Sequence, residues 1–132
     1  MLKTHVIATV ILLLFDLLWV GTFMGKKYQD QVQQIQNDKM VVRPLFGVLA
    51  YFLMVVGLNL FVLPRIRKGH ELRDSIKYGF LFGIVLYGVY DFTAAAVLKD
   101  WDVKLAITDI VWGGVVYFLA AYLGTKLSSI TV

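Results

Sequence analysis

The sequence predicts an all-α fold, a four-helix transmembrane bundle in which residues 1–132 form a single integral membrane domain. Hydrophobic residues make up 59% of the chain and charged residues only 17%, whereas a soluble globular chain is about 45–50% apolar and about 25% charged. The apolar residues are gathered into four blocks, at about residues 5–24, 45–63, 78–98 and 105–123. A helix needs about 20 residues to cross the hydrocarbon core, and only helices satisfy their own backbone there. Each block is therefore expected to be a transmembrane helix.

The first block follows Lys3, as the core of a signal peptide would. It is longer than a typical signal-peptide core, contains Asp16 and lacks a cleavage site of the A-x-A type. We expect it to be retained as the first transmembrane helix.

The polar connection after the first block contains Tyr28, Val32 and Ile35 at intervals of four and three residues. This spacing indicates a short amphipathic helix in the first loop, lying on the membrane surface. Pro44 suits the first turn of the second span, where its missing N–H has no helical partner to lose. Pro64 is expected to end that span.

The connection at residues 99–104 is so short that the third and fourth helices are expected to form an antiparallel hairpin. Four crossings place both termini and the middle loop on one side of the membrane. That side carries seven of the 13 lysines and arginines, with the densest cluster at residues 65–77. Cytoplasmic loops are enriched in basic residues, so we expect both termini in the cytoplasm.

The composition also limits the chemistry. The chain has no cysteine, which excludes disulfides and thiolate sites. No span carries a histidine pair for haem, and no glycine-rich phosphate loop is present, so no cofactor is expected. The net charge of +4 lies mainly in loops that would contact lipid headgroups. The lipid bilayer is the expected partner, and nucleic acid is not.

Three aspartates interrupt the apolar spans: Asp16 in the first, Asp91 in the third and Asp109 in the fourth. Each costs about 2.5–3.5 kcal/mol on insertion scales. At about 1.5 Å per residue they lie about 12, 10 and 6 Å from the same membrane face. We therefore predict that three helices contribute one acidic layer in one half of the bilayer.

Helical spacing gives these aspartates predicted neighbours. Tyr87 lies one turn before Asp91, and Trp112 follows Asp109 by three residues. The same interval separates Asp16 from a tryptophan in the first span. Three further residues are assigned supporting roles: Trp19, Thr93 and Arg43.

Two interpretations of the acidic layer compete. In the functional one, Asp91 and Asp109 are the core ligands of a wet cavity that binds a proton, a cation or a small cationic ligand, with Asp16 as the third carboxyl. In the structural one, the aspartates bond to Thr, Tyr, Trp or Arg43 and only hold the helices together. A carboxylate site for a divalent metal stays open.

The leading functional hypothesis is therefore a binding or transport protein, acting as a homo-oligomer if it transports. The alternative is a non-catalytic accessory or assembly subunit of a larger membrane complex. A membrane-embedded enzyme that uses a carboxylate as acid or base on lipid is the least favoured of the three. Asp91→Asn and Asp109→Asn variants distinguish them.

The chain resembles a bacterial membrane protein family catalogued as domain of unknown function 2177. The resemblance rests on Y-D-[LF]-T at residues 90–93, L-K-x-W at 98–101 and D-x-x-W-G at 109–113, and on an opening D-x-x-W at 16–19. Ala94 replaces an asparagine of the family pattern, which puts any role of that amide in doubt. The resemblance implies a four-helix membrane architecture and brings no known activity, cofactor or catalytic residue.

Overall fold

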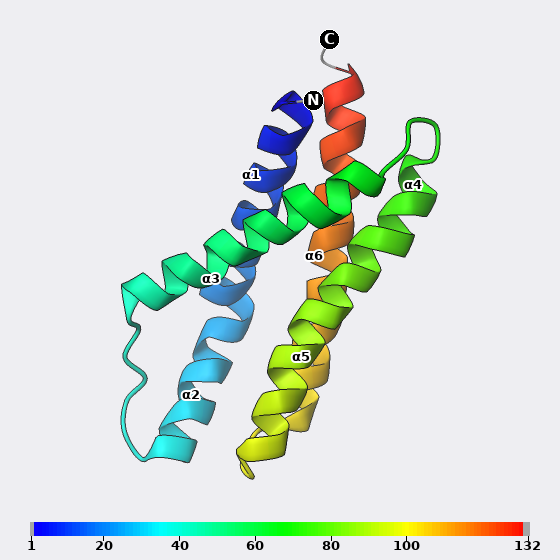
Figure 1. The fold of residues 1–132 in the computed structure, drawn as a ribbon. Helices are drawn as coiled ribbons and strands as arrows, with labels where there is room; N and C mark the ends of the chain where they lie inside the picture. The colour runs from blue at the N-terminus through cyan, green and yellow to red at the C-terminus, as the bar shows by residue number, and fades with distance from the viewer. Residues whose placement is uncertain (1, 131–132) are drawn as a thin grey trace.

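The computed structural model describes residues 2–130, and within that range all regular secondary structure is helical (Figure 1). Four helical runs are long and apolar enough to cross a membrane: Leu2–Gln36, Pro44–Arg65, Glu71–Val97 and Val103–Ser129. The predicted fold class, all-α with four helices able to span a bilayer, is confirmed.

The first run consists of α1 (Leu2–Leu18), a π-helical segment η1 (Trp19–Met24) and α2 (Gly25–Gln36). The predicted amphipathic segment is helical, but it continues the first run instead of forming a separate helix. Gly25 makes this continuation possible, because a Cβ at this position would lie 2.2 Å from the Val20 carbonyl oxygen. The wide π turn thus brings that carbonyl against a residue without a side chain.

The second run consists of α3 (Pro44–Gly57), a π-helical segment η2 (Leu58–Val62) and a 3₁₀ turn η3 (Leu63–Arg65). Pro44 occupies its first turn and Pro64 its last turn, as predicted. Asn59 in η2 donates to the Val55 carbonyl at 2.8 Å and to the Thr9 hydroxyl of α1 at 3.0 Å. These bonds tie the end of the second run to α1.

The third run consists of α4 (Glu71–Asp74), a π-helical segment η4 (Ser75–Phe80) and α5 (Leu81–Val97), and a short turn leads into α6 (Val103–Ile130). The loop before α4 is held by Arg67, whose Nε and Nη2 each donate to an oxygen of buried Asp74 at 2.9 Å. This hydrogen bond raises the pKa of the exposed Arg67 guanidinium, which keeps its charge at any physiological pH.

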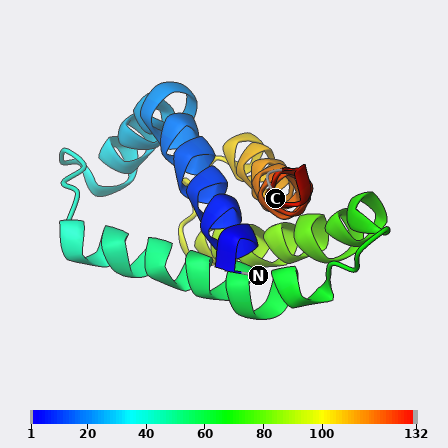
Figure 2. The ribbon, with the colours of Figure 1, turned by 90° about the horizontal axis from the view of Figure 1, so that it is seen from above.

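Helix α6 packs against both α1 and α5 and is the most buried of the four crossing helices (Figure 2). Glycines allow the close approach. A Cβ on Gly83 would lie 1.9 Å from the Gly113 carbonyl oxygen. A Cβ on Gly124 would lie 2.7 Å from the Cβ atom of Ala8. Small residues at such contacts are the usual means by which helices associate in lipid.

Helix α3 crosses the other helices obliquely (Figure 1). Its continuation packs on the core through Leu58 and Val62, which are fully buried. The first half of α3 instead exposes large apolar side chains, among them Leu45, Phe46 and Leu49. This half stands away from the α1–α6–α5 layer, and a cavity lies beneath it.

Candidate functional site

The three intramembrane aspartates are all buried: Asp91 is 0% exposed, Asp16 5% and Asp109 6%. They come from α5, α1 and α6. Asp16 and Asp109 line the same cavity, and Asp91 lies beside Asp109. The helix packing thus gathers three carboxyls from three separate helices, which is the arrangement that their depths in the sequence predict.

Asp16 accepts three hydrogen bonds, each from a different helix. Tyr87 Oη of α5 and Trp112 Nε1 of α6 donate to Oδ1 at 2.7 and 2.9 Å, and Tyr51 Oη of α3 donates to Oδ2 at 2.9 Å. All three donors are neutral side chains. One carboxyl of α1 therefore joins all the other crossing helices.

The two D-x-x-W pairs exchange partners across the antiparallel helices α1 and α6. Trp112 donates to Asp16, while Trp19 lies beside Asp109. The two indoles stack on each other, with ring centroids 4.6 Å apart and an interplanar angle of 5°. Equal spacing on two antiparallel helices therefore produces a local twofold pattern, in which each aspartate faces the other helix's tryptophan.

The Asp91–Asp109 pair sits among polar groups that lack hydrogen-bond partners. Trp101 lies beside Asp91, and Tyr28 lies beside Asp109. Within the described protein, neither oxygen of Asp91 has a partner of good geometry, and the same holds for Tyr28 Oη and the Nε1 atoms of Trp19 and Trp101. Buried polar atoms are normally bonded, and exceptions of this kind mark places where a proton, a water molecule or a ligand can bind.

The cavity next to this pair has a volume of about 550 Å³. It lies between the first helical run, α3 and α5. Its acidic residues are Asp16 and Asp109, and the remaining walls are apolar or aromatic; the aromatic side chains are Tyr28, Tyr51, Tyr87, Tyr90 and Trp101. Among the described residues, no lysine, arginine or histidine lines it.

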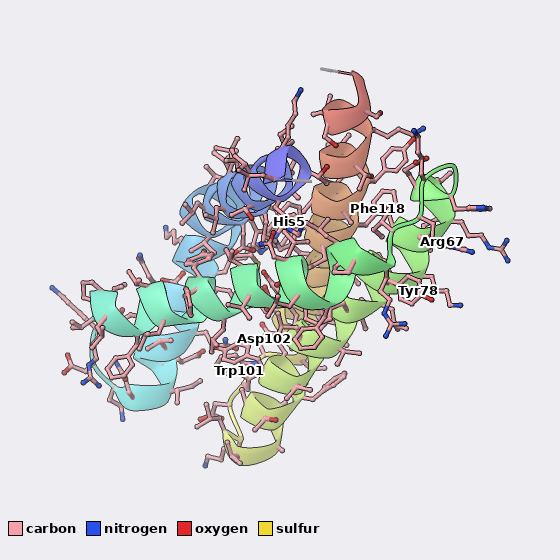
Figure 3. All side chains as sticks on the ribbon, turned by 45° about the horizontal axis from the view of Figure 1, so that its top comes forward. His5, Arg67, Tyr78, Trp101, Asp102 and Phe118 are labelled. Atoms are coloured by element: carbon pink, nitrogen blue, oxygen red, sulfur yellow. The ribbon has the colours of Figure 1, made fainter. Side chains whose placement is uncertain are left out.

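Helix α2 and the turn between α5 and α6 close one end of the cavity. Gln31 Oε1 accepts a hydrogen bond from the backbone N–H of Asp102. This contact holds Trp101 near Tyr28 and Tyr90, with ring centroids 6.4 and 6.0 Å away. Figure 3 shows Trp101 and Asp102 where α2 approaches the lower end of α5. The side of α2 that carries the predicted amphipathic stripe therefore faces the candidate site.

Charge in this site is not neutralised by a basic side chain. The ion pairs among the described residues are Arg67–Asp74 and Lys126–Glu71, and neither involves the three buried aspartates. The described residues also contain no group of three His, Cys, Asp or Glu that could hold a metal ion. The arrangement therefore suits a proton or an organic cation, because carboxylates and aromatic faces both attract positive charge.

Two of the predicted supporting residues are not brought to the site. Thr93 is exposed, since two residues along a helix turn a side chain by about 200° from Asp91. Arg43 lies at the start of α3, with its guanidinium 4.5 Å from the centroid of the Phe46 ring. Trp19, the third, lies beside Asp109.

Four aromatic residues of the site are absent from the sequence-based assignment: Tyr28, Tyr51, Tyr90 and Trp101. Tyr28 belongs to the amphipathic stripe. The helical spacing of this stripe would predict Tyr28 as a site residue if the stripe were assigned to the bundle interior and not to the membrane surface. Tyr51 had no such signal, because its position depends on how α3 crosses the bundle.

No similar protein was found among curated proteins or solved structures. The family described as "Predicted membrane protein (DUF2177)" matches residues 1–126, nearly the full length, and together with the four apolar helices this makes the chain an integral, multi-pass membrane protein. The protein therefore belongs to the DUF2177 family of membrane proteins.

Proposed function

We propose that this membrane protein binds a small organic cation in the cavity formed by Asp16, Asp109 and the surrounding aromatic side chains. The observation that carries the proposal is a cavity with two buried carboxyls and five aromatic side chains, and with no basic side chain among its described lining residues. Its volume of about 550 Å³ falls within the range of about 300–1,000 Å³ that is typical of small-molecule sites.

The chemistry of the lining favours an organic cation over a metal ion. A metal ion needs several ligands at short distance, and the described residues contain no group of three His, Cys, Asp or Glu placed to hold one. An ammonium group instead gains from the faces of Tyr and Trp rings as well as from carboxylates, by about 2 kcal/mol or more for a desolvated ring contact. The cavity offers both kinds of contact.

A second function, an accessory subunit of a larger membrane complex, is favoured by a different observation. Asp16 is fully bonded inside the protein, and α3 turns Phe46 and Phe52 outward, 53% and 61% exposed. An internally satisfied carboxyl and an outward aromatic face are what a structural subunit would show.

Binding of benzyltrimethylammonium to the purified protein distinguishes these functions. Its uncharged isostere, neopentylbenzene, has the same shape and tests whether charge is recognised. We expect the cation to bind at least about tenfold more tightly than the isostere, which corresponds to about 1.4 kcal/mol. Intrinsic tryptophan fluorescence reports the binding, because Trp101 lines the cavity.

The matched variants are Asp109→Asn, in the cavity, and Asp100→Asn, in the exposed turn near it. Both remove one formal charge. We expect Asp109→Asn to abolish the preference for the cation and Asp100→Asn to retain it. Equal affinity for the cation and the neutral isostere in the wild type would contradict cation binding, and would leave the accessory function as the better account.

A further inference from the structure

The cavity opens sideways, toward the hydrocarbon of the bilayer. Leu53 of α3 and Leu86 and Tyr90 of α5 line it, and they are also 67%, 37% and 58% exposed. Residues that both line a cavity and are exposed mark its rim. Leu53 is the tenth residue of the 22-residue run Pro44–Arg65, about 15 Å from its start. The rim therefore lies at the depth of the lipid chains.

The opposite end of the cavity is acidic. Asp16 and Asp109 are 5% and 6% exposed, and Trp101, which also lines the cavity, has a buried indole N–H without a partner in the described protein. The two carboxyls of the lining are thus buried, whereas its exposed rim consists of Leu53, Leu86 and the Tyr90 side chain. A ligand that matches this arrangement has a charged end and a hydrocarbon end.

We infer that the ligand is an alkylammonium amphiphile, whose cationic group reaches Asp109 while its hydrocarbon chain extends through the rim between α3 and α5 into the bilayer. This inference rests on the proposed function and specifies its ligand class. The same chemistry occurs in a phospholipid with an amine headgroup and in a free long-chain amine.

Chain length provides the test. The protein is placed in nanodiscs of phosphatidylglycerol, whose headgroup has no ammonium, and is titrated with butyl-, octyl- and dodecyltrimethylammonium. The signal of Asp109→Asn in the same nanodiscs is subtracted as non-specific partitioning. We expect affinity to rise about tenfold for every two methylenes, since each buried methylene contributes about 0.8 kcal/mol.

Affinity independent of chain length would show that the chain stays in water, and would overturn the inference while cation binding stands. Failure of benzyltrimethylammonium and of all three alkyl probes to bind would instead remove the proposed function itself. The two failures are therefore distinguishable.

The position of the rim is tested by adding bulk to α3. Ala50 lines the cavity and is exposed, whereas Val48 is 66% exposed and is not among the lining residues. We expect Ala50→Trp to weaken dodecyltrimethylammonium about tenfold, because overpacking costs about 1–3 kcal/mol, and Val48→Trp to leave its affinity unchanged. Equal affinities for both variants, with unchanged thermal stability, would contradict a rim at this position.

The two sources of the amphiphile are separated by the lipid itself. Half of the phosphatidylglycerol is kept, and the other half is replaced either by phosphatidylethanolamine or by an uncharged galactolipid, so that the surface charge is the same in both. With phosphatidylethanolamine a site for phospholipid amines is already filled, and dodecyltrimethylammonium binds more weakly than with the galactolipid. A site for free amines keeps the same affinity in both lipids. Either result supports an alkylammonium ligand and identifies its source. Loss of chain-length dependence in both lipids overturns the inference.

Discussion

Asp16 differs from the other two buried aspartates in how its carboxyl is satisfied. It accepts hydrogen bonds from Tyr51, Tyr87 and Trp112, whereas Asp91 has no partner of good geometry within the described protein. A carboxyl that accepts three bonds holds helices together, while one without hydrogen-bond partners forms no such link between helices. The structural and functional interpretations of the acidic layer therefore apply to different residues.

Asp16→Ala should destabilise the protein strongly. It leaves three partly buried donors without an acceptor, and we expect a loss of about 2–4 kcal/mol in the free energy of unfolding, since interhelical bonds in membranes are individually modest but these three act together. Denaturation in mixed micelles measures it, with exposed Asp100→Ala as the control. A difference below about 0.5 kcal/mol between the two variants would mean that these bonds do not support the fold.

The sequence predicted which aspartates form the acidic layer better than it predicted the residues that surround them. Depth along each span follows from the rise per residue, so the common level of Asp16, Asp91 and Asp109 could be anticipated. The partner of a side chain depends on how helices rotate and cross. Tyr51 was missed for this reason, and Arg43 was assigned a supporting role that its position at the start of α3 does not give it.

At the scale of elements, Gly113 determines how α5 reaches α1. A Cβ at this position would lie 2.3 Å from Cγ of the Tyr87 ring, so the ring packs directly on the α6 backbone. From there its hydroxyl reaches Asp16 of α1. The small residue in one helix thus permits a hydrogen bond between two others.

Gly113→Ala should therefore displace Tyr87 and break its bond to Asp16. We expect a loss of about 1–3 kcal/mol from overpacking and from the unsatisfied hydroxyl. Gly21→Ala is the control, because a Cβ at Gly21 meets nothing within 4 Å. Thermal unfolding followed by circular dichroism compares the two, and equal melting temperatures would show that the ring can move aside at no cost.

Periodicity predicted the helices but not always the surface against which each helix packs. The stripe of Tyr28, Val32 and Ile35 is helical as expected, yet its inward side packs on the turn after α5. Helical spacing alone does not distinguish a lipid surface from a protein surface. The π-helical segments had no sequence signal except Gly25, whose missing Cβ gives the Val20 carbonyl its space.

At the scale of the whole molecule, block length and hydropathy were sufficient to predict four crossing helices, because the thickness of the bilayer sets the length of each. The oblique course of α3 was not predictable from these quantities. It follows from where Leu58 and Val62 meet the core, while the first half of the helix has no such contact. The cavity exists because of this obliquity, and its occupant remains our proposal.

The most direct test of a cation-binding acidic cavity is covalent labelling with dicyclohexylcarbodiimide in membranes. Protonated carboxyls that this lipid-soluble reagent can reach add to its carbodiimide carbon, and the product rearranges to a stable N-acylurea. Mass spectrometry of the intact protein and its peptides locates the adduct. We predict labelling at Asp109, which lines the cavity, slowed by benzyltrimethylammonium but not by neopentylbenzene. Absence of an adduct at Asp109, or labelling there at the same rate with and without the cation, would contradict the account.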